Sequence, residues 1–268
     1  MGGMAMKTAN KVALGILLCA LMVASLLQMQ QDFLSGRRLA PAGRQARAET
    51  KQTQYAPVGD AVPTPRPARF TRDAIVIDGV PIVHQMPRWP TGCEVVSIKM
   101  LAEFYGVNKT VDEWILRMPR GDIYWRAGRR RGPDPRKKFA GNPYSVHSYG
   151  VYHQPMLAML QPYFGDRLIN MTGRPWGEYE DMIIAGNPIA IWGTIENLPI
   201  FLRGTWVTPA GDEYQWRGNG HTMVLVGFSK TEVVVNDPFT GTQRRFNKEI
   251  FLQRWADMGK QGIAIRPN

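Results

Sequence analysis

The sequence has few cysteines. Its 268 residues contain two, Cys19 and Cys93. Cys19 lies in an apolar N-terminal run and Cys93 lies in the body of the chain, so we expect no disulfide between them. A single cysteine in the body of an exported protein is either a small buried residue or a reactive thiol.

Motifs for metals, cofactors and nucleic acid are also absent from the sequence. It contains no HExxH, no pair of CxxC motifs, no phosphate-binding loop and no dinucleotide fingerprint, so we expect no metal site and no cofactor. The net charge of +11 favours anionic partners. No nucleic-acid-binding motif accompanies this charge, and nucleic acid is therefore not expected as a partner.

Residues 1–31 have the pattern of an N-terminal signal or membrane anchor. Lys7 and Lys11 precede an uncharged segment, Val12–Gln31, whose strongly apolar part ends at Leu27. No good cleavage site follows, which favours an uncleaved transmembrane helix that tethers the protein to the membrane, with the body outside the cytoplasm; a cleaved signal would instead give a secreted protein. The arginines that follow the run leave the inverted orientation open.

The rest of the chain divides into a tether and a folded domain. Residues 32–72 are rich in Ala, Pro, Arg, Gln and Thr without apolar periodicity, which predicts a flexible tether. Residues 73–268 are predicted to form one folded domain. Within it, the basic segment Arg126–Lys138 is predicted to be a loop. This loop either binds an anionic cell-wall polymer or lipid headgroups, or is a solvated surface.

The order of the predicted elements indicates an α+β fold. Asp78-Gly79 between two short apolar runs, Ala74–Ile77 and Val80–Val83, predicts a hairpin. Apolar residues at helical spacing predict a helix that begins near Cys93 and stops at Gly106. We also predict helices at 111–118, 154–163, 176–185 and 248–258, and strands at 189–192, 222–228, 232–236, 244–246 and 262–265. Helices come first and an antiparallel sheet follows.

His221 and Asp237 flank the predicted hairpin of strands 222–228 and 232–236. The two ends of an antiparallel hairpin meet, with opposite Cβ atoms roughly 5 Å apart. A carboxylate there would fix the tautomer of the imidazole and stabilise its cation. Asp-Pro at a strand end is also a common turn, so a structural role for Asp237 stays open.

Cys93 is predicted to lie in the first turn of its helix. The positive end of the helix dipole stabilises a thiolate there, and the free backbone N–H of Cys93 would form half of an oxyanion hole. Gly92 would leave room for a substrate carbonyl. Gln85 would supply the second oxyanion donor through its amide, although a glutamine at a strand end is usually only solvated.

Several segments resemble family thirty-nine of the cysteine peptidases, which includes the double-glycine-leader peptidases that process bacteriocins. Residues 80–85 and 90–94 are similar to the nucleophile region of that family, and residues 220–227 and 235–238 to its histidine and aspartate segments. Residues 134–135, 139–144 and 149–152 resemble a further segment of its free-standing, exported branch. The similarity covers about residues 78–265.

The resemblance implies a papain-like fold in which Cys93 is the nucleophile, His221 the base, Asp237 the orienting carboxylate and Gln85 the oxyanion donor. The expected activity is that of a cysteine peptidase, which transfers the acyl group of a peptide or protein substrate to water; transfer to an amine stays open. The alternative is a non-catalytic, membrane-tethered module that binds peptide or cell wall on the same fold.

Overall fold

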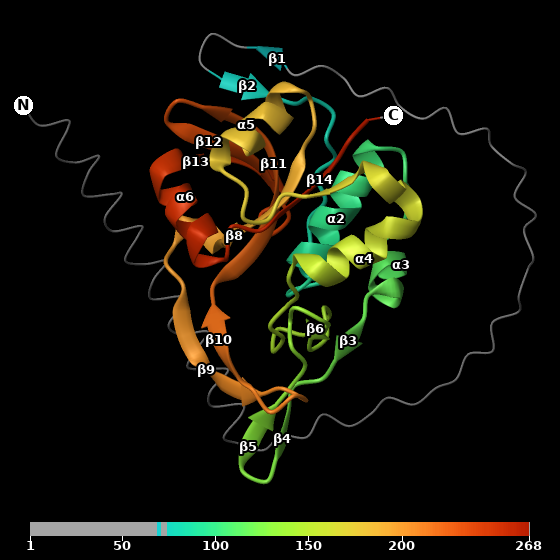
Figure 1. Cartoon of the computed structure of the whole chain (residues 1–268), viewed down its shortest axis with the longest axis vertical. Helices are drawn as coiled ribbons and strands as arrows, with labels where there is room; N and C mark the ends of the chain where they lie inside the picture. Colours follow the sequence, from blue (N-terminus) through green and yellow to red (C-terminus); the bar gives the residue numbers. More distant parts are fainter. Residues whose placement is uncertain (1–68, 71–73, 268) are drawn as a thin grey trace, which may run out of the picture. The chain divides into compact units, whose positions relative to one another are not determined.

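The computed structural model describes residues 69–70 and 74–267 (Figure 1). The predicted N-terminal segment and nearly all of the predicted tether lie outside these residues. The boundaries predicted after residues 31 and 72 therefore stay predictions. Within the described residues the fold is α+β, as the sequence predicted.

The described part of the chain contains no transmembrane helix, which corrects the prediction for those residues. None of the helices within residues 74–267 combines the length and the apolar character needed to cross a membrane. The two longest, Cys93–Phe104 and His153–Phe164, have 12 residues each, whereas a span needs about 20. Residues 1–31, on which the prediction rested, lie outside the described part of the chain.

Three helices form the N-terminal part of the fold: α2 (Cys93–Phe104), α3 (Val111–Arg117) and α4 (His153–Phe164). Helix α2 is buried nearly all round, because apolar side chains occupy most of its length. Helix α3 begins with a capping box, in which Thr110 and Glu113 each accept a hydrogen bond from the other's backbone N–H. The helices predicted for these segments are confirmed.

The main sheet is antiparallel, with strands in the order β1-β2-β11-β8-β14-β7; β12 pairs with β11, and β13 pairs with β12. The strands are β1 (Arg69–Phe70), β2 (Ala74–Val76), β7 (Leu168–Asn170), β8 (Ile189–Thr194), β11 (Gly220–Ser229), β12 (Glu232–Asp237), β13 (Thr242–Asn247) and β14 (Gly262–Ile265). Every residue of β8 is buried, which requires cover on both faces of the sheet. Figure 1 shows α2–α4 on one side of the sheet and α5 (Trp176–Ile184) and α6 (Lys248–Asp257) on the other.

A second, smaller sheet has the strand order β10-β9-β5-β4. Its strands are β4 (Tyr124–Arg126), β5 (Arg129–Arg131), β9 (Phe201–Val207) and β10 (Glu213–Gly218). Strands β3 (Arg120–Gly121) and β6 (Phe139–Ala140), which flank β4 and β5 in the sequence, form a separate two-stranded pair. A separate apolar cluster of Ala140, Trp206 and Trp216 supports the second sheet. The segment predicted as a basic loop therefore contains strand β5, and the hairpin of β9 and β10 was not predicted.

The predicted hairpin at Ala74–Val83 is wrong. Asp78-Gly79 does make a turn, with Gly79 at φ 81°, but residues 80–83 form no strand. Strand β2 pairs instead with β11. The carbonyl oxygen of Val80 accepts a hydrogen bond from a distant side chain instead, because Asn236 Nδ2 donates to it at 3.0 Å. A local turn signal was outweighed by pairing with a distant strand.

Candidate active site

Cys93 is the first residue of α2, as predicted, with Gly92 as the N-cap. Gly92 is required for a different reason from the predicted one. A Cβ atom at this position would lie 2.8 Å from Trp89 Cβ, so the tight turn before the helix excludes any side chain. That turn is held by the Gly92 N–H, which donates to Trp89 O at 2.8 Å. Cys93 is buried, with 8% of the residue exposed.

A β-bulge places His221 and Asp237 on the same face of the sheet. Near the hairpin turn Gly227 pairs with Val234, but beyond the bulge Val224 pairs with Asn236. The next position along the strand is Met223, which therefore lies opposite Asp237. Since alternate residues of a strand share a face, His221 points to the same side as Asp237. A hairpin without this one-residue shift would turn the two side chains to opposite faces.

The His221 imidazole and the Asp237 carboxylate are hydrogen-bonded. The Nε2 atom of His221 lies 2.7 Å from Asp237 Oδ1, and both side chains are buried. Asp237 also accepts hydrogen bonds from Phe239 N at 2.8 Å and from the Thr240 hydroxyl at 3.3 Å. Although burial raises the pKa of Asp237, the hydrogen bond and charge of His221 outweigh it and hold that pKa below its usual value. Asp237 is therefore a carboxylate that fixes the ring of His221.

Cys93 lies next to the strand that carries His221. Ser97, on the same helix, donates to the backbone oxygen of Thr222 at 2.9 Å, and Thr222 is the residue after His221 in β11. Within the described residues no hydrogen bond joins Cys93 to His221. Because Asp237 occupies Nε2, the ring nitrogen left for another partner is Nδ1.

The thiol instead contacts Glu94, a residue that the sequence analysis missed. Cys93 Sγ donates to Glu94 Oε2 at 3.4 Å, and Glu94 Oε1 accepts from Val151 N at 2.9 Å. Gly150, at φ 120°, makes room for this carboxylate, because a Cβ there would lie 2.1 Å from Glu94 Oε1. An acidic residue in the first turn of a helix usually only complements the helix dipole, so its sequence position carried no signal.

Burial and Glu94 oppose ionisation of Cys93. Burial raises the pKa of the Cys93 thiol well above its usual value, and the Glu94 carboxylate raises it further. Burial also raises the pKa of Glu94 itself, to about 7. The helix dipole alone predicts the opposite shift for Cys93. The electrostatics of this site in the absence of substrate therefore favour a neutral thiol.

Gln85 lies close to both halves of the site. Its backbone N–H donates to Pro238 O at 2.9 Å, directly after Asp237, and its side-chain Nε2 donates to Pro90 O at 3.1 Å. The side chain is buried, and its Oε1 has no hydrogen-bond partner among the described residues. The amide retains one further N–H, which is the group that a second oxyanion donor requires.

A small cavity of about 20 Å³ lies beside His221. Its lining includes Glu94, His221, Tyr149 and Trp192. His221 is only 3% exposed, so substrate would reach the ring through a narrow opening. His153, the other buried histidine of the described residues, is hydrogen-bonded through Nδ1 to Gln261 Oε1 at 2.9 Å.

Comparison with known proteins identifies relatives of this fold and sequence. The model of a family described as Peptidase C39-like matches residues 77–263. The uncharacterized protein YvpB of Bacillus subtilis (strain 168) is 27% identical over 180 residues, which cover 67% of this chain and 71% of that protein. A crystal structure described as a "putative C39-like peptidase" from Bacillus anthracis superposes with a TM-score of 0.67 and 27% identity, over 73% of this chain and 98% of that one.

Proposed function

Because the chain belongs to the Peptidase C39-like family, we propose that it is a cysteine peptidase that acts outside the cytoplasm. Cys93 is the nucleophile, His221 the base, Asp237 the residue that orients it and Gln85 an oxyanion donor. The hydrogen bond of 2.7 Å between His221 Nε2 and Asp237 Oδ1, on the strand that contacts Cys93, carries this proposal.

The proposed reaction is acyl transfer through a thioester. The Cys93 thiol gives its proton to His221 Nδ1 as Sγ attacks the carbonyl carbon of a peptide bond. The second N–H of Gln85 and the backbone N–H of Cys93 hold the oxyanion. His221 then protonates the leaving amine as the C–N bond breaks. Water, deprotonated by His221, attacks the thioester and releases the acid and the thiol.

The extracytoplasmic location rests on the N-terminal sequence. Lys7 and Lys11 followed by an uncharged apolar run are typical of segments that enter the export machinery. We expect the protein to be secreted after this segment is removed. N-terminal sequencing of the protein recovered from the medium of expressing bacteria tests this, and recovery of the uncut chain in the cytoplasm would contradict it.

The rate of Cys93 alkylation by iodoacetamide, measured on the full chain across pH, tests the catalytic proposal. Since the thiol is neutral in the free protein, its reaction near pH 7 requires His221 as base. We expect His221→Ala to lower the rate at least about tenfold at that pH. The control is His84→Ala, which removes an exposed imidazole and should leave the rate unchanged.

One observation favours the alternative function, a non-catalytic module that binds peptides. The Cys93 thiol is buried, and its hydrogen bond goes to Glu94 rather than to the imidazole. If Cys93 reacts as slowly as an ordinary buried thiol, with equal rates in the original chain and in His221→Ala, the peptidase proposal fails and the binding module is supported. Cleavage of a labelled unfolded protein that disappears in Cys93→Ala would decide for the peptidase.

A further inference from the structure

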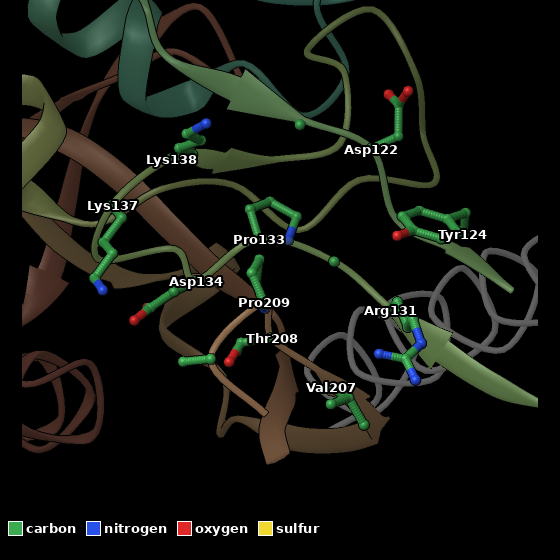
Figure 2. A pocket seen from close by; sticks show the side chains of 13 residues that line it. Asp122, Tyr124, Arg131, Pro133, Asp134, Lys137, Lys138, Val207, Thr208 and Pro209 are labelled. Atoms are coloured by element: carbon green, nitrogen blue, oxygen red, sulfur yellow. The ribbon is translucent and has the colours of Figure 1, made fainter. Parts of the chain in front are cut away.

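The second sheet borders a cavity that the proposed reaction does not use. Its volume is about 470 Å³, and it lies among the end of β3, the β4–β5 hairpin, residues 132–138 and the turn that joins β9 to β10. Figure 2 shows Pro133 and Pro209 in its middle, with Arg131 to one side and Asp134 and Lys137 to the other. The cavity therefore has an apolar floor between polar walls.

Two polar groups of the cavity have no partner in the described part of the chain. Thr208 is 2% exposed, and its hydroxyl makes no hydrogen bond. The buried Nε of Arg131 has no acceptor. Both residues line this cavity. Buried polar atoms in folded proteins are nearly always hydrogen-bonded, and a ligand in this cavity could supply the partners that Thr208 and Arg131 lack.

The charges of the lining favour an anionic ligand. Three cations, Arg131, Lys137 and Lys138, face two carboxylates, Asp122 and Asp134. Asp134 is already paired with Arg136, whose Nε lies 2.9 Å from Asp134 Oδ1. Although burial raises the pKa of Asp134, Arg136 and the charge of Lys137 hold it below its usual value.

This pairing leaves Arg131 and Lys138 without an ion pair among residues 74–267. A guanidinium carries a fork of N–H donors that matches the two oxygens of a carboxylate. A hydroxyl such as that of Thr208 can donate to the same anion. The cavity therefore has the donors that a carboxylate needs, next to apolar surface that fits the rest of a side chain.

Aromatic contacts connect the cavity to the candidate active site. Trp206 Nε1 donates to Pro133 O in the cavity wall at 2.9 Å. The ring of Trp206 packs edge-on against Tyr149 at 5.2 Å, and Tyr149 lines the small cavity that also contains His221. The cavity and the small cavity beside His221 are therefore joined by the packed rings of Trp206 and Tyr149.

The shape of this region favours a peptide over a polymer or a membrane. Tyr124, on the cavity wall, belongs to β4, which is an edge strand of the second sheet in the described residues. An edge strand offers backbone groups to an extended peptide, and alternate peptide side chains then enter neighbouring pockets. Sugars and lipid headgroups do not present this backbone pattern.

We propose that the cavity is a subsite that binds an acidic side chain of an extended peptide substrate. The inference rests on the proposed peptidase function and adds the substrate class, namely peptides with a carboxylate at a distance from the bond that is cut. Arg131 binds the carboxylate through its fork, Thr208 donates a further hydrogen bond, and the two lysines attract the ligand.

Calorimetry on the full chain with Cys93→Ala tests this inference at low salt, because cleavage cannot interfere. The probes are Ac-(Ala-Glu)5-NH2 and its neutral counterpart Ac-(Ala-Gln)5-NH2. We expect the Glu peptide to bind at least about tenfold more tightly. Arg131→Met should reduce its affinity to that of the Gln peptide, and Thr208→Val should weaken it about threefold or more.

Two matched controls separate binding from general effects of charge and packing. Arg129→Met removes an equal charge from an exposed position on the same strand, and Thr194→Val removes a buried, unpartnered hydroxyl that does not line the cavity. Neither should change the affinity more than about twofold. Equal binding of the two peptides, or equal losses in Arg131→Met and Arg129→Met, would overturn the subsite.

Two further outcomes have a defined meaning. Arg131-dependent binding to phosphatidylglycerol vesicles without binding of the Glu peptide would replace the peptide with a phosphate-bearing surface, and would overturn the inference. Arg131-dependent binding of the Glu peptide, combined with alkylation that ignores His221, would support the subsite while the peptidase proposal fails. Normal alkylation behaviour without peptide binding would leave the peptidase standing and remove the subsite.

Discussion

At the scale of single residues, the state of Cys93 depends on its neighbour Glu94. The carboxylate accepts the thiol proton's hydrogen bond at 3.4 Å and is held in turn by Val151 N. A substrate that displaced this contact would leave the thiol proton to His221 alone. Glu94 is thus expected to restrain the nucleophile in the free protein, where an unrestrained thiolate would be open to oxidation.

Glu94→Gln should make Cys93 more reactive. Removing the carboxylate removes a charge that raises the pKa of the thiol, while burial continues to act on it. We expect the midpoint of the alkylation rate against pH to move down, because the charge of Glu94 no longer opposes ionisation of the thiol. A midpoint that moves up would mean that Glu94 serves as a base for Cys93.

The same substitution should change how stability depends on pH. Because burial raises the pKa of Glu94 from 4.5 to about 7, the folded state binds its proton more tightly than the unfolded state does. The resulting stabilisation is present below pH 4.5 and is lost as the pH rises through 7. Its size is roughly 3 kcal/mol.

Urea unfolding at several pH values checks this prediction. Relative to Glu94→Gln, the original chain should lose that free energy of unfolding between acidic pH and pH 8. The control is Glu249→Gln, which changes an exposed glutamate at the same position of α6 and should show no such dependence. Parallel pH profiles of the Glu94 variant and the original chain would show that Glu94 does not titrate in this range.

At the scale of elements, the segment that ends at Gly150 supports the helix that carries Cys93. Ala140 N donates to Gly150 O at 2.9 Å, and Gly150 has φ 120° where it passes Glu94. A side chain here is excluded both by the backbone conformation and by the carboxylate. The position of Cys93 thus depends on a turn more than fifty residues away in the chain.

Gly150→Ala should destabilise the fold and disturb this contact. We expect a loss of about 2–4 kcal/mol in the free energy of unfolding, measured by urea titration, because the added Cβ strains the backbone and displaces Glu94. The control is Gly177→Ala in α5, where a Cβ meets nothing within 4 Å. That variant should be as stable as the original chain or slightly more stable. Equal stability of both variants would contradict the proposed contact.

The elements that the sequence predicted are those with strong local patterns. Helix α2 and strand β8 are apolar and buried along nearly their whole length, so composition alone revealed them. Strands β9 and β10 were missed because few of their residues are buried and only Trp206 and Trp216 belong to the apolar cluster that supports them. Strand β5 joins β9 through one distant pair, Arg131 and Val207, which no local pattern encodes.

The sequence predicted candidate members of the site, but it did not predict their environment. The sequence shows Gln85, Cys93, His221 and Asp237 in the order expected from the family resemblance. In the structure, His221 is hydrogen-bonded to Asp237, and Cys93 lies next to β11, the strand that carries His221. The raised pKa of Cys93 was not predictable, since burial and Glu94 act only after the chain has folded. The sequence around Cys93 predicts a helix dipole that lowers the pKa of its thiol. In the folded chain, burial and the Glu94 carboxylate raise that pKa instead.

At the scale of the described domain, two apolar clusters of very different size support the two sheets. The main cluster surrounds β8 and β11, whereas the second consists of Ala140, Trp206 and Trp216 with a few neighbours. A small cluster gives its sheet less resistance to local opening than the main core has. We therefore expect the second sheet to open more readily than the rest of the domain.

Trp206→Phe should loosen the second sheet selectively. It removes the hydrogen bond to Pro133 O and part of the ring contact with Tyr149. We expect amide hydrogen exchange in β5 and β9 to speed up at least about tenfold, with β8 and β11 unchanged. The control is Trp125→Phe, an exposed ring. Uniform acceleration across both sheets would show that they open as one unit.

The bulge in β11 also constrains how the hairpin of β11 and β12 can change in length. His221 and Asp237 are an even number of residues apart in the sequence. Near the turn, Gly227 pairs with Val234, an odd number of residues away; without a bulge, any two residues of β11 and β12 on the same face would therefore be an odd number of residues apart. The extra residue of the bulge changes this interval from odd to even. In relatives with the same hairpin, a single residue gained or lost within the paired parts of β11 or β12 must be accompanied by loss of the bulge or by a second bulge, whereas residues added to the turn at 229–232 leave the pairing unchanged. Changes in the length of the paired strands should therefore occur in twos, or together with a changed number of bulges.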